Sequence, residues 1–353
     1  ESKRDKTLLY EDWDSNIAFT QEAKRGDAEH EIASASHVVK TRVGIARQSG
    51  TPIEPRAVLV SYDEVNDVYD IYATVQSAQR LQGYLASELQ LPKGKFHVRV
   101  MDVGGGFGTK GAQSYPEYAL ACIFSKDAGV SVKWTSTRTE DLLETASGRD
   151  EYCNIVLACD HNGKILALKA DLESDAGVSG TLSIMAGISL KLIPGSYRIP
   201  NLDLKATAYV TNKGPLGPVR GAGRPEACFF IERAVDLMAR KISIDPIEFR
   251  RRNAILPGEF PYDNGAGFTY DGGNFPLLLD MLVKSSDYSD LIESRSSAYG
   301  KFRQGEASVT GIGVCLEVED TGAQLNETAR IVFEKSGSVK VFTGSSPHGQ
   351  GLE

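Results

Sequence analysis

Apolar and polar residues alternate in several short stretches of the chain, which is the pattern of strands with one buried face. Residues 56–62 and 67–74 alternate in this way and predict two antiparallel strands. Residues 151–159 and 164–173 do so on either side of Asp160-His-Asn-Gly163, so a hairpin is predicted there. Extended structure is also expected at residues 8–48, 95–103, 130–134, 307–319, 328–334 and 338–343.

Other stretches carry apolar residues at helical spacing. Leu81, Leu85 and Leu89 repeat every four residues after Ser77, a residue type that caps helices well. Further helices are predicted at residues 115–125, 138–145, 227–240, 245–252, 276–284 and 287–302. Strands and helices follow no strand-helix-strand rhythm, so the expected class is α+β, with mixed and antiparallel sheets and packed helices rather than a parallel sheet.

The length of 353 residues exceeds what one hydrophobic core usually covers, so two domains are expected. After Asn253 the chain becomes rich in Pro, Gly, Asp and aromatic residues, as a connection between domains would be. The predicted division is a first domain over residues 1–255, a connection over 256–274 and the beginning of a second domain over 275–353.

Composition narrows the function classes. The chain has 47 acidic against 39 basic residues, and its net charge of −8 argues against a nucleic-acid or membrane-surface role. No apolar run is long enough to span a membrane. The five cysteines are odd in number and include no C-x-x-C pair, so we expect reduced thiols and a cytoplasmic location. Cys228 lies on the predicted helix 227–240 and is expected to be a core residue. The five histidines, His348 among them, lack ligand spacing and are interpreted as structural or surface residues.

The most unusual stretch is Met101-Asp-Val-Gly-Gly-Gly-Phe-Gly-Thr-Lys110, which follows a predicted strand. Because glycine has no Cβ, such a run lets successive N–H groups approach a ligand closely. A phosphate loop needs Ser or Thr after its lysine, but Gly111 stands there. A dinucleotide fingerprint opens a helix directly, whereas Tyr115-Pro116 begins the next helix. Both motifs fit poorly, and a plain turn or a ligand loop of another kind stays open.

Two further glycine-rich loops follow, at residues 214–225 and 344–351. The first contains Arg220, and Gln76 ends another predicted strand in a similar way. Together these segments would surround a large polar ligand with backbone donors, a side-chain amide and a guanidinium. None of the loops holds an evident nucleophile or base, so the reactive chemistry is expected to belong to a cofactor.

Four motifs, in this order, resemble those of one enzyme family. They are Thr74-Val-Gln-Ser77, Gly104-Gly-Gly-Phe-Gly-Thr-Lys110, Val219-Arg-Gly-Ala-Gly-Arg-Pro-Glu-Ala227 and Gly349-Gln-Gly351. The chain is similar, from about residue 8 to its last residue, to the molybdenum-binding large subunit of the xanthine dehydrogenase, aldehyde oxidase and carbon monoxide dehydrogenase family. Each motif alone is weak, whereas four in order are specific.

The resemblance implies a molybdenum hydroxylase that oxidises an aldehyde or an N-heterocycle with water as the oxygen source. Its cofactor would be molybdopterin with molybdenum, with or without the cytosine dinucleotide extension. Its partners would be an FAD-binding medium subunit, a small subunit with two-iron two-sulfur clusters, and the remainder of the large subunit. Neither nucleic acid nor a membrane is expected as a partner.

The resemblance also implies roles for single residues. Gln76 and Arg220 would be catalytic residues, Gln76 by hydrogen-bonding the oxo group on molybdenum and Arg220 on the side where the substrate approaches. No side chain of this chain is expected to coordinate the metal. The N–H groups of residues 106–108 would meet the pterin and the oxygen ligands of the metal, and residues 349–351 would hold the pterin or its nucleotide. The implied cofactor-binding residues are Gln76, Gly105, Gly106, Phe107, Gly108, Arg220, Gly221, Ala222, Gly349, Gln350 and Gly351.

Several departures from the family pattern restrict the expected activity. Gly221 stands where the carbon monoxide dehydrogenases carry a cysteine, and Gly111 where xanthine-type enzymes carry a glutamate, so neither CO nor purines are favoured. The glutamate that serves the family as general base has no counterpart here, although Glu54 and Glu226 lie near the motifs. We therefore expect a natural half of a split subunit or a truncated piece. A non-catalytic scaffold and a simple nucleotide-binding module are the alternatives.

Overall fold

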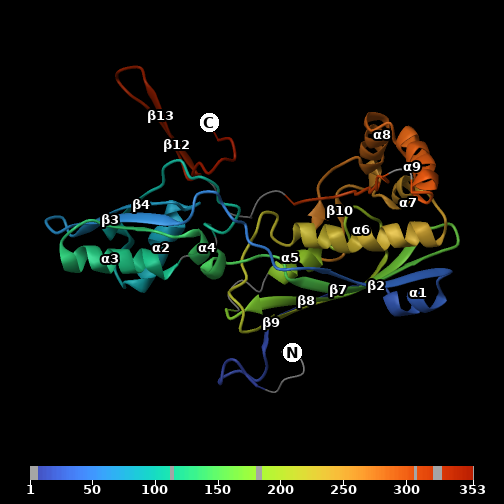
Figure 1. Ribbon diagram of the computed structural model, residues 1–353, viewed down its shortest axis with the longest axis horizontal. Coiled ribbons are helices and arrows are strands. Elements are labelled where there is room, and N and C mark those ends of the chain that lie inside the picture. Colours follow the sequence, from blue (N-terminus) through green and yellow to red (C-terminus); the bar gives the residue numbers. More distant parts are fainter. Residues whose placement is uncertain (1–6, 112–114, 180–184, 306–307, 321–327, 353) are drawn as a thin grey trace.

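The computed structural model describes residues 7–111, 115–179, 185–305, 308–320 and 328–352. The larger sheet has the strand order β1 (Ile17–Arg25), β9 (Asn201–Val210), β8 (Ile165–Gly177), β7 (Glu151–Cys159) and β2 (His37–Ile45). The smaller sheet has the order β5 (Phe96–Arg99), β4 (Val68–Ala73), β3 (Ala57–Asp63) and β6 (Val132–Thr135). Neighbours are antiparallel except β8 with β9 and β4 with β5. The predicted α+β class with mixed and antiparallel sheets is confirmed, and Figure 1 shows the two sheets side by side.

The main hydrophobic core lies between the larger sheet and helix α6 (Arg224–Lys241), with α5 (Met185–Leu192) beside it. Successive strand residues point to opposite faces, so Leu168 belongs to this core while Ala167 contacts helix α1 (Ala28–Ser34) on the other face (Figure 1). The buried residues of α6 recur at spacings of three and four, which gives the helix one apolar face: Ala227, Phe230, Ile231, Ala234, Val235 and Met238.

A second core lies between the smaller sheet and the helices α2 (Ala78–Glu88) and α3 (Pro116–Ala128). Ser77 caps α2 as predicted, because its side chain accepts a hydrogen bond from the N–H of Arg80. Leu81 and Leu85 are buried and Leu89 packs beside them. The predicted antiparallel pair is present as β3 and β4, and the predicted hairpin as β7 and β8.

Some predictions were wrong where the pattern is short or interrupted. The region 8–48, expected to be extended, contains α1, which begins at Asp27 through a hydrogen bond from the N–H of His30. No element is predicted for residues 185–210, and they contain α5 and β9, an interior strand of the larger sheet. Strand β5 ends at Arg99 and not at residue 103, so a longer segment leads into the glycine loop.

The strand expected at residues 307–319 is also wrong, because the described part, residues 308–320, forms no strand. Side chains take the place of a neighbouring strand as hydrogen-bond partners. The N–H of Leu316 donates to Glu232 and its carbonyl accepts from Ser196. The carbonyl of Val314 accepts from Arg250. The segment is therefore fixed to α6 and to α7 (Pro246–Asn253) by buried polar groups.

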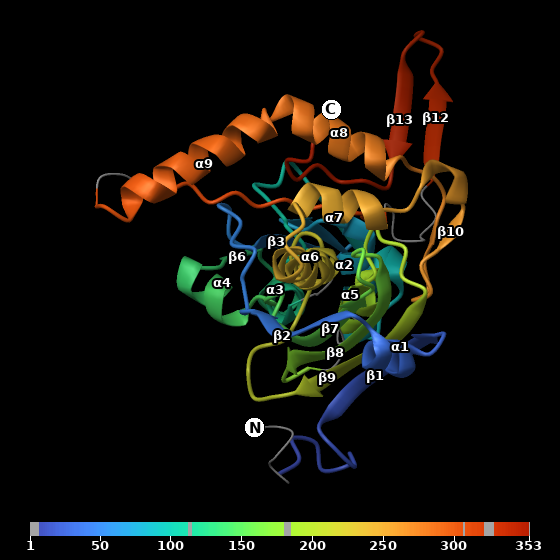
Figure 2. The same ribbon diagram turned by 90° about the vertical axis from the view of Figure 1, so that its right-hand side faces the viewer.

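The later elements pack on the main core and then leave it. The residues predicted as a connection contribute Phe260, Tyr262, Phe268 and Tyr270 to that core, and the division into domains there stays a prediction. The hairpin β12–β13 projects from the body in Figure 2. None of the helices in the described ranges has the length and apolar character needed to cross a bilayer. The remaining elements are the short 3-10 helices η1 (Lys93–Lys95) and η3 (Pro257–Glu259), the hairpin of β10 (Tyr262–Asp263) and β11 (Thr269–Tyr270), α8 (Phe275–Ser285), α9 (Tyr288–Phe302), β12 (Ala329–Phe333) and β13 (Val339–Thr343).

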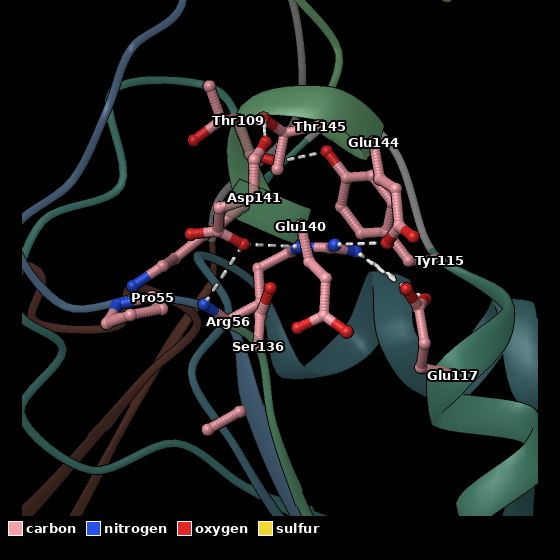
Figure 3. Close-up of polar contacts among 12 residues, drawn as sticks. Pro55, Arg56, Thr109, Tyr115, Glu117, Ser136, Glu140, Asp141, Glu144 and Thr145 are labelled. Carbon is pink, nitrogen blue, oxygen red and sulfur yellow. Dashed lines mark hydrogen bonds and ion pairs between the residues drawn. The ribbon is translucent and has the colours of Figure 1, made fainter. Parts of the chain in front are cut away.

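Beside the smaller sheet, one buried arginine gathers three acidic side chains (Figure 3). Arg56, directly before β3, donates from Nε to Asp141 and from Nη2 to Glu144, both at 3.0 Å. These two carboxylates belong to α4 (Arg138–Glu144), and Glu117 of α3 lies 3.4 Å from Nη1. The guanidinium also lies 4.0 Å from the ring centroid of Tyr115. Burial alone would lower the pKa of Arg56, but the carboxylates raise it, so the group keeps its charge.

Replacing Arg56 with alanine should lower the free energy of unfolding by about 3–5 kcal/mol, because the buried Asp141 carboxylate loses its main partner and keeps only the longer contact with Arg138 at 3.7 Å. Arg42→Ala is a matched control, since Arg42 also pairs with a carboxylate, Glu173 at 3.9 Å, and lies over a tyrosine ring, but is exposed. That variant should lose less than about 1 kcal/mol. Urea unfolding measures both, and equal losses would show that the Arg56 ion pairs stabilise no more than surface ones.

Candidate functional site

The glycine loop, residues 104–111, turns back on itself after β5. The N–H of Thr109 donates to the carbonyl of Gly106 at 3.0 Å, and that of Gly111 to Gly108 at 3.1 Å. Phe107 has a φ of +51°, which is rare for a residue other than glycine, and its side chain is exposed. Gly108 has a φ of +93°, and a Cβ there would lie 2.3 Å from the carbonyl oxygen of Pro218. The loop therefore presents main chain and one aromatic ring.

Polar contacts behind the loop hold it to the smaller sheet and its helices. Glu54 accepts from the N–H of Gly104 at 2.7 Å and from Nζ of Lys110 at 3.1 Å. The hydroxyl of Tyr115 donates to the carbonyl of Thr109 at 2.7 Å (Figure 3). Lys110 is buried, and this burial lowers its pKa although Glu54 opposes the shift. Because Lys110 points inward to a carboxylate, it is not placed to bind the phosphates of a nucleotide.

The side chain of Gln76 is oriented by the glycine loop. The N–H of Gln76 donates to the carbonyl of Lys110 at 2.9 Å, and Oε1 of Gln76 accepts from the N–H of Gly108 at 2.9 Å. The N–H of Gly108, which is expected to meet the ligand, donates to Gln76 in this structure. With Oε1 engaged, Nε2 of Gln76 is the end that can donate to a ligand. Among the residues that the structure describes, the N–H groups of Gly106 and Phe107 have no hydrogen-bond partner.

The second loop, residues 219–223, lies against the glycine loop, because the N–H of Arg220 donates to the carbonyl of Phe107 at 3.0 Å. Arg149 supports it from behind. Its Nη2 donates to the carbonyl of Arg220 at 2.6 Å and its Nη1 to Glu226 at 2.9 Å. Gly221 and Ala222 have φ values of +98° and +45°, so both take the left-handed conformation that turns the chain into α6. The side chain of Arg220 is left exposed.

The third loop, residues 344–351, closes the site. The N–H of Val103 donates to the carbonyl of Pro347 at 3.2 Å, which joins this loop to the segment before the glycine loop. The segments enclose a pocket of about 440 Å³. Most of the predicted site residues are thus brought together around one space, whose lining is Gln76, Gly106, Phe107, Gly108, Arg220, His348, Gly349 and Gln350.

Four predicted site residues do not line this pocket. A Cβ on Gly105 would lie 2.8 Å from the ring of Phe107, so Gly105 makes room for that ring. Gly221 and Ala222 shape the Arg220 loop, and Gly351 is the last residue of the third loop. Conversely, His348, interpreted from the sequence as a structural or surface residue, does line the pocket and is half-buried. Its place inside a glycine-rich loop is the one signal in the sequence that could have indicated this.

A second cavity of about 710 Å³ adjoins the pocket. The two share Gln76, Gly108, His348 and Gln350, so a long ligand could occupy both. The additional lining is rich in hydroxyl, amide and guanidinium groups: Ser77, Gln79, Arg80, Gly111, Pro218, Thr328, Gly344, Ser345 and Ser346. Within the described ranges, no three His, Cys, Asp or Glu side chains gather as a metal-ligand set.

Comparison with known proteins assigns the family. Two models of a molybdopterin cofactor-binding domain match residues 9–254 and 282–353. The chain belongs to this family of molybdenum-binding large subunits. The pocket residues come from both matched regions, since Gln76, Phe107 and Arg220 lie in the first and His348 in the second.

The molybdopterin-binding chain is similar to subunits of several oxidoreductases. The gamma subunit of the 6-hydroxypseudooxynicotine dehydrogenase complex of Paenarthrobacter nicotinovorans is 30% identical over 335 residues, which are 93% of this chain and 41% of that subunit. The carbon monoxide dehydrogenase large chain of Afipia carboxidovorans is 30% identical over 340 residues, 91% of this chain and 42% of the relative. Quinoline 2-oxidoreductase from Pseudomonas putida 86 shares the fold, with a TM-score of 0.88 at 24% identity over 99% of this chain and 46% of the other. The chain thus spans less than half the length of these relatives.

The departures from the family motifs have a structural basis in this molybdopterin-binding chain. A Cβ on Gly221 would lie 2.4 Å from Cγ of Pro225, so a cysteine at this position would require the loop to move. A Cβ on Gly111 would lie 3.1 Å from the Gln76 side chain. The two glutamates near the motifs are engaged elsewhere, Glu54 with Lys110 and Glu226 with Arg149. Neither lines the pocket.

A buried carboxyl pair lies behind the Arg220 loop. Glu151, the first residue of β7, and Glu226 in the first turn of α6 are both buried. Among the described residues, Oε2 of each has no hydrogen-bond partner. Burial, together with the charge of Glu226, raises the pKa of Glu151 to about 8, although Ser189 and Arg149 oppose this. Glu151 therefore keeps its proton at neutral pH, while Glu226 forms an ion pair with Arg149.

This proton predicts a pH dependence of stability. Between pH 4.5 and 8 the folded protein keeps a proton on Glu151 that the unfolded chain has lost, so stability falls as the pH rises through this window. The slope should be about 1.4 kcal/mol per pH unit. Glu151→Gln lacks this contribution, so its free energy of unfolding in urea should not show this fall. The difference between variant and natural protein should therefore shift in favour of the variant from pH 5 to pH 8. Glu22→Gln, on the exposed strand β1, is the control and should keep the natural slope; a parallel slope in Glu151→Gln would contradict the assignment.

Proposed function

We propose that this chain forms the cofactor-binding part of the large subunit of a molybdenum hydroxylase, which oxidises an aldehyde or an N-heterocycle and takes the oxygen atom from water. The observation that carries the proposal is the pocket in which Gln76, Phe107 and Arg220 meet. Its polar groups are N–H donors, the side-chain amides of Gln76 and Gln350, the cation of Arg220 and the imidazole of His348, and none of the predicted site residues is a nucleophile or a base. Such a lining suits a site whose chemistry is supplied by a cofactor.

The residues of the chain would bind and orient that cofactor. Gln76 would donate from Nε2 to an oxygen ligand of the metal, because its Oε1 is held by Gly108. The N–H groups of Gly106 and Phe107 would donate to the pterin or to the ligand oxygens. Arg220 would place its charge on the side where the substrate enters. When bound, molybdopterin with molybdenum takes two electrons from the substrate and lets oxygen from water enter the product.

The adjoining cavity suggests that the pterin carries a nucleotide. Its lining includes Arg80 and the hydroxyl groups of Ser345 and Ser346, which suit a phosphate and a ribose. Residues 349–351 would hold the junction, since Gln350 lines both cavities. We therefore favour a dinucleotide form of the cofactor, and the resemblance to the family implies cytosine as its base.

The proposed enzyme has further parts. Electrons would leave through an iron–sulfur small subunit and an FAD-binding medium subunit, and the remainder of the large subunit would complete the active site. The hairpin β12–β13 supports the presence of this remainder, because its apolar side chains are exposed: Ile331 by 58%, Phe333 by 80% and Val341 by 63%. An isolated two-stranded hairpin is marginally stable in water, so a further part of the protein is expected to cover it. Unpaired cysteines are in keeping with a cytoplasmic enzyme.

The alternatives explain less of the structure. A scaffold without cofactor would not need an amide oriented by Gly108 or a Phe107 held at positive φ. A nucleotide-binding module would need Lys110, which instead contacts Glu54 inside the protein. Oxidation of CO is not favoured, because position 221 has no room for a cysteine side chain without movement of Pro225.

The first test of the proposal is cofactor content. In the complex purified from a host that makes the cofactor, molybdenum by elemental analysis and pterin by fluorescence should approach one per large subunit. Gly106→Val should reduce both by about tenfold, because its Cβ would lie 2.5 Å from the Gln76 side chain and fill the space of the ligand. Gly258→Val is the control, since no atom lies within 4 Å of a Cβ there. Full pterin content in Gly106→Val would contradict the proposal that the glycine loop binds the cofactor and would show that the loop is a plain turn.

A second test separates binding from catalysis at Gln76. Gln76→Glu keeps an oxygen that accepts from Gly108 but replaces the outward NH₂ donor with a second acceptor. Turnover should fall by about a hundredfold, because one donor to an oxygen ligand is lost. Pterin content should change less than about twofold. Steady-state kinetics and pterin fluorescence measure the two effects; unchanged turnover, or loss of the pterin, would contradict the role given to Gln76.

A further inference from the structure

Two cysteines outside the pocket lie in contact. The Sγ atoms of Cys228 and Cys315 are 3.2 Å apart and join α6 to the segment 308–320. Cys315 is exposed and Cys228 half-buried, so the expectation that Cys228 is a core residue is wrong. The other cysteines, Cys122, Cys153 and Cys159, are buried. A reagent in solution can therefore reach Cys315, and Cys228 beside it, more easily than the other three thiols.

The main chain around Cys315 is held firmly in place. On one side of it the carbonyl of Val314 accepts from Arg250 at 2.7 Å, and on the other the N–H of Leu316 donates to Glu232 at 3.1 Å. Glu232 lies one helical turn after Cys228 on α6, so the two side chains share one face of the helix. The same helix face thus anchors the segment and presents a sulfur atom to it.

The two thiols differ in acidity. The hydrogen bond between the sulfur atoms lowers the pKa of Cys315 and raises the pKa of Cys228. Burial and the carboxylates of Glu232 and Glu317 act against the shift at Cys315, and Arg250 acts with it. The exposed thiol is therefore the better nucleophile, and the half-buried thiol lies beside it.

We propose that Cys228 and Cys315 form a reversible redox pair that closes to a disulfide by exchange with a small-molecule disulfide such as oxidised glutathione. The Cys315 thiolate attacks one sulfur of the oxidant, forming a mixed disulfide and releasing one thiolate. Cys228, losing its proton, then attacks Sγ of Cys315 and displaces the second thiolate. Two protein thiols lose two electrons and two protons, and the small disulfide becomes two thiols. The sulfur atoms need only approach from 3.2 Å to the bonded distance of about 2.0 Å.

The disulfide would connect two segments that lead to the pocket. Helix α6 begins directly after the Arg220 loop, and its Arg224 already contacts Asp320 at 2.6 Å. The segment 308–320 leads towards β12, β13 and the third loop. Oxidation would therefore add a covalent link to the contact between α6 and the segment 308–320, which the reduced protein holds by polar side chains and by the packing of Leu316 in the main core.

The proposal is tested by oxidation of the reduced, folded protein with oxidised glutathione at pH 8. Free thiols are then alkylated, and tryptic peptides are analysed by mass spectrometry. The expected product is a peptide pair that links Cys228 to Cys315 and separates on treatment with dithiothreitol, while Cys122, Cys153 and Cys159 stay alkylatable after unfolding. Glutathione retained on Cys315 without the linked peptide pair would overturn the proposal, and so would oxidation of the three buried cysteines at the same rate.

Two variants assign the roles within the pair. Cys228→Ser should stop at the mixed disulfide and carry one glutathione on Cys315. Cys315→Ser should react with oxidised glutathione at least about tenfold more slowly than the natural protein, because the remaining thiol is half-buried.

Limited proteolysis gives a second readout. Oxidation should slow cleavage within residues 308–320 by about tenfold in the natural protein but should not slow it in Cys228→Ala. Equal protection in that variant would contradict a link between the two cysteines.

Discussion

The ion pairs of the buried Arg56 hold together the elements on which the glycine loop rests. They join the start of β3 to α3 and α4, and they fix the ring of Tyr115, whose hydroxyl binds the carbonyl of Thr109. A buried guanidinium is very costly without partners, so both helices must supply their carboxylates for β3 to begin where it does. The loop therefore gains a rigid base, which allows it to expose main chain with few side chains of its own.

From this base the site is built by mutual orientation of backbone and amide. Gly108 gives its N–H to Gln76, which leaves the Nε2 group of Gln76 as the outward donor. The carbonyl of Phe107 accepts from the N–H of Arg220, and the carbonyl of Arg220 accepts from Arg149. The glycine loop thus orients both Gln76 and the Arg220 loop. Such preorganisation matters because donors that are already aimed need no reorganisation when charge develops on a ligand.

The sequence predicted well those elements whose pattern is local and uninterrupted. Helix α2, the hairpin β7–β8 and helix α6 follow from spacing alone, and the glycine motifs identified the loops that line the pocket. Other features depend on partners far away in the chain. The segment 308–320 alternates like a strand, but its hydrogen bonds go to Glu232, Arg250 and Ser196. The approach of Cys228 to Cys315 has the same origin, because it requires the tertiary packing of α6.

The pocket is completed by a segment that comes late in synthesis. Its first wall ends with residue 111 and its second with residue 223, whereas the third is formed by residues 344–351 and joins the first through Val103 and Pro347. Domains generally fold as units during synthesis, and N-terminal ones fold before later ones. Two walls would therefore be folded while the site is still open on one side. A large ligand could enter from that side during this interval, and emergence of the third loop would then enclose it.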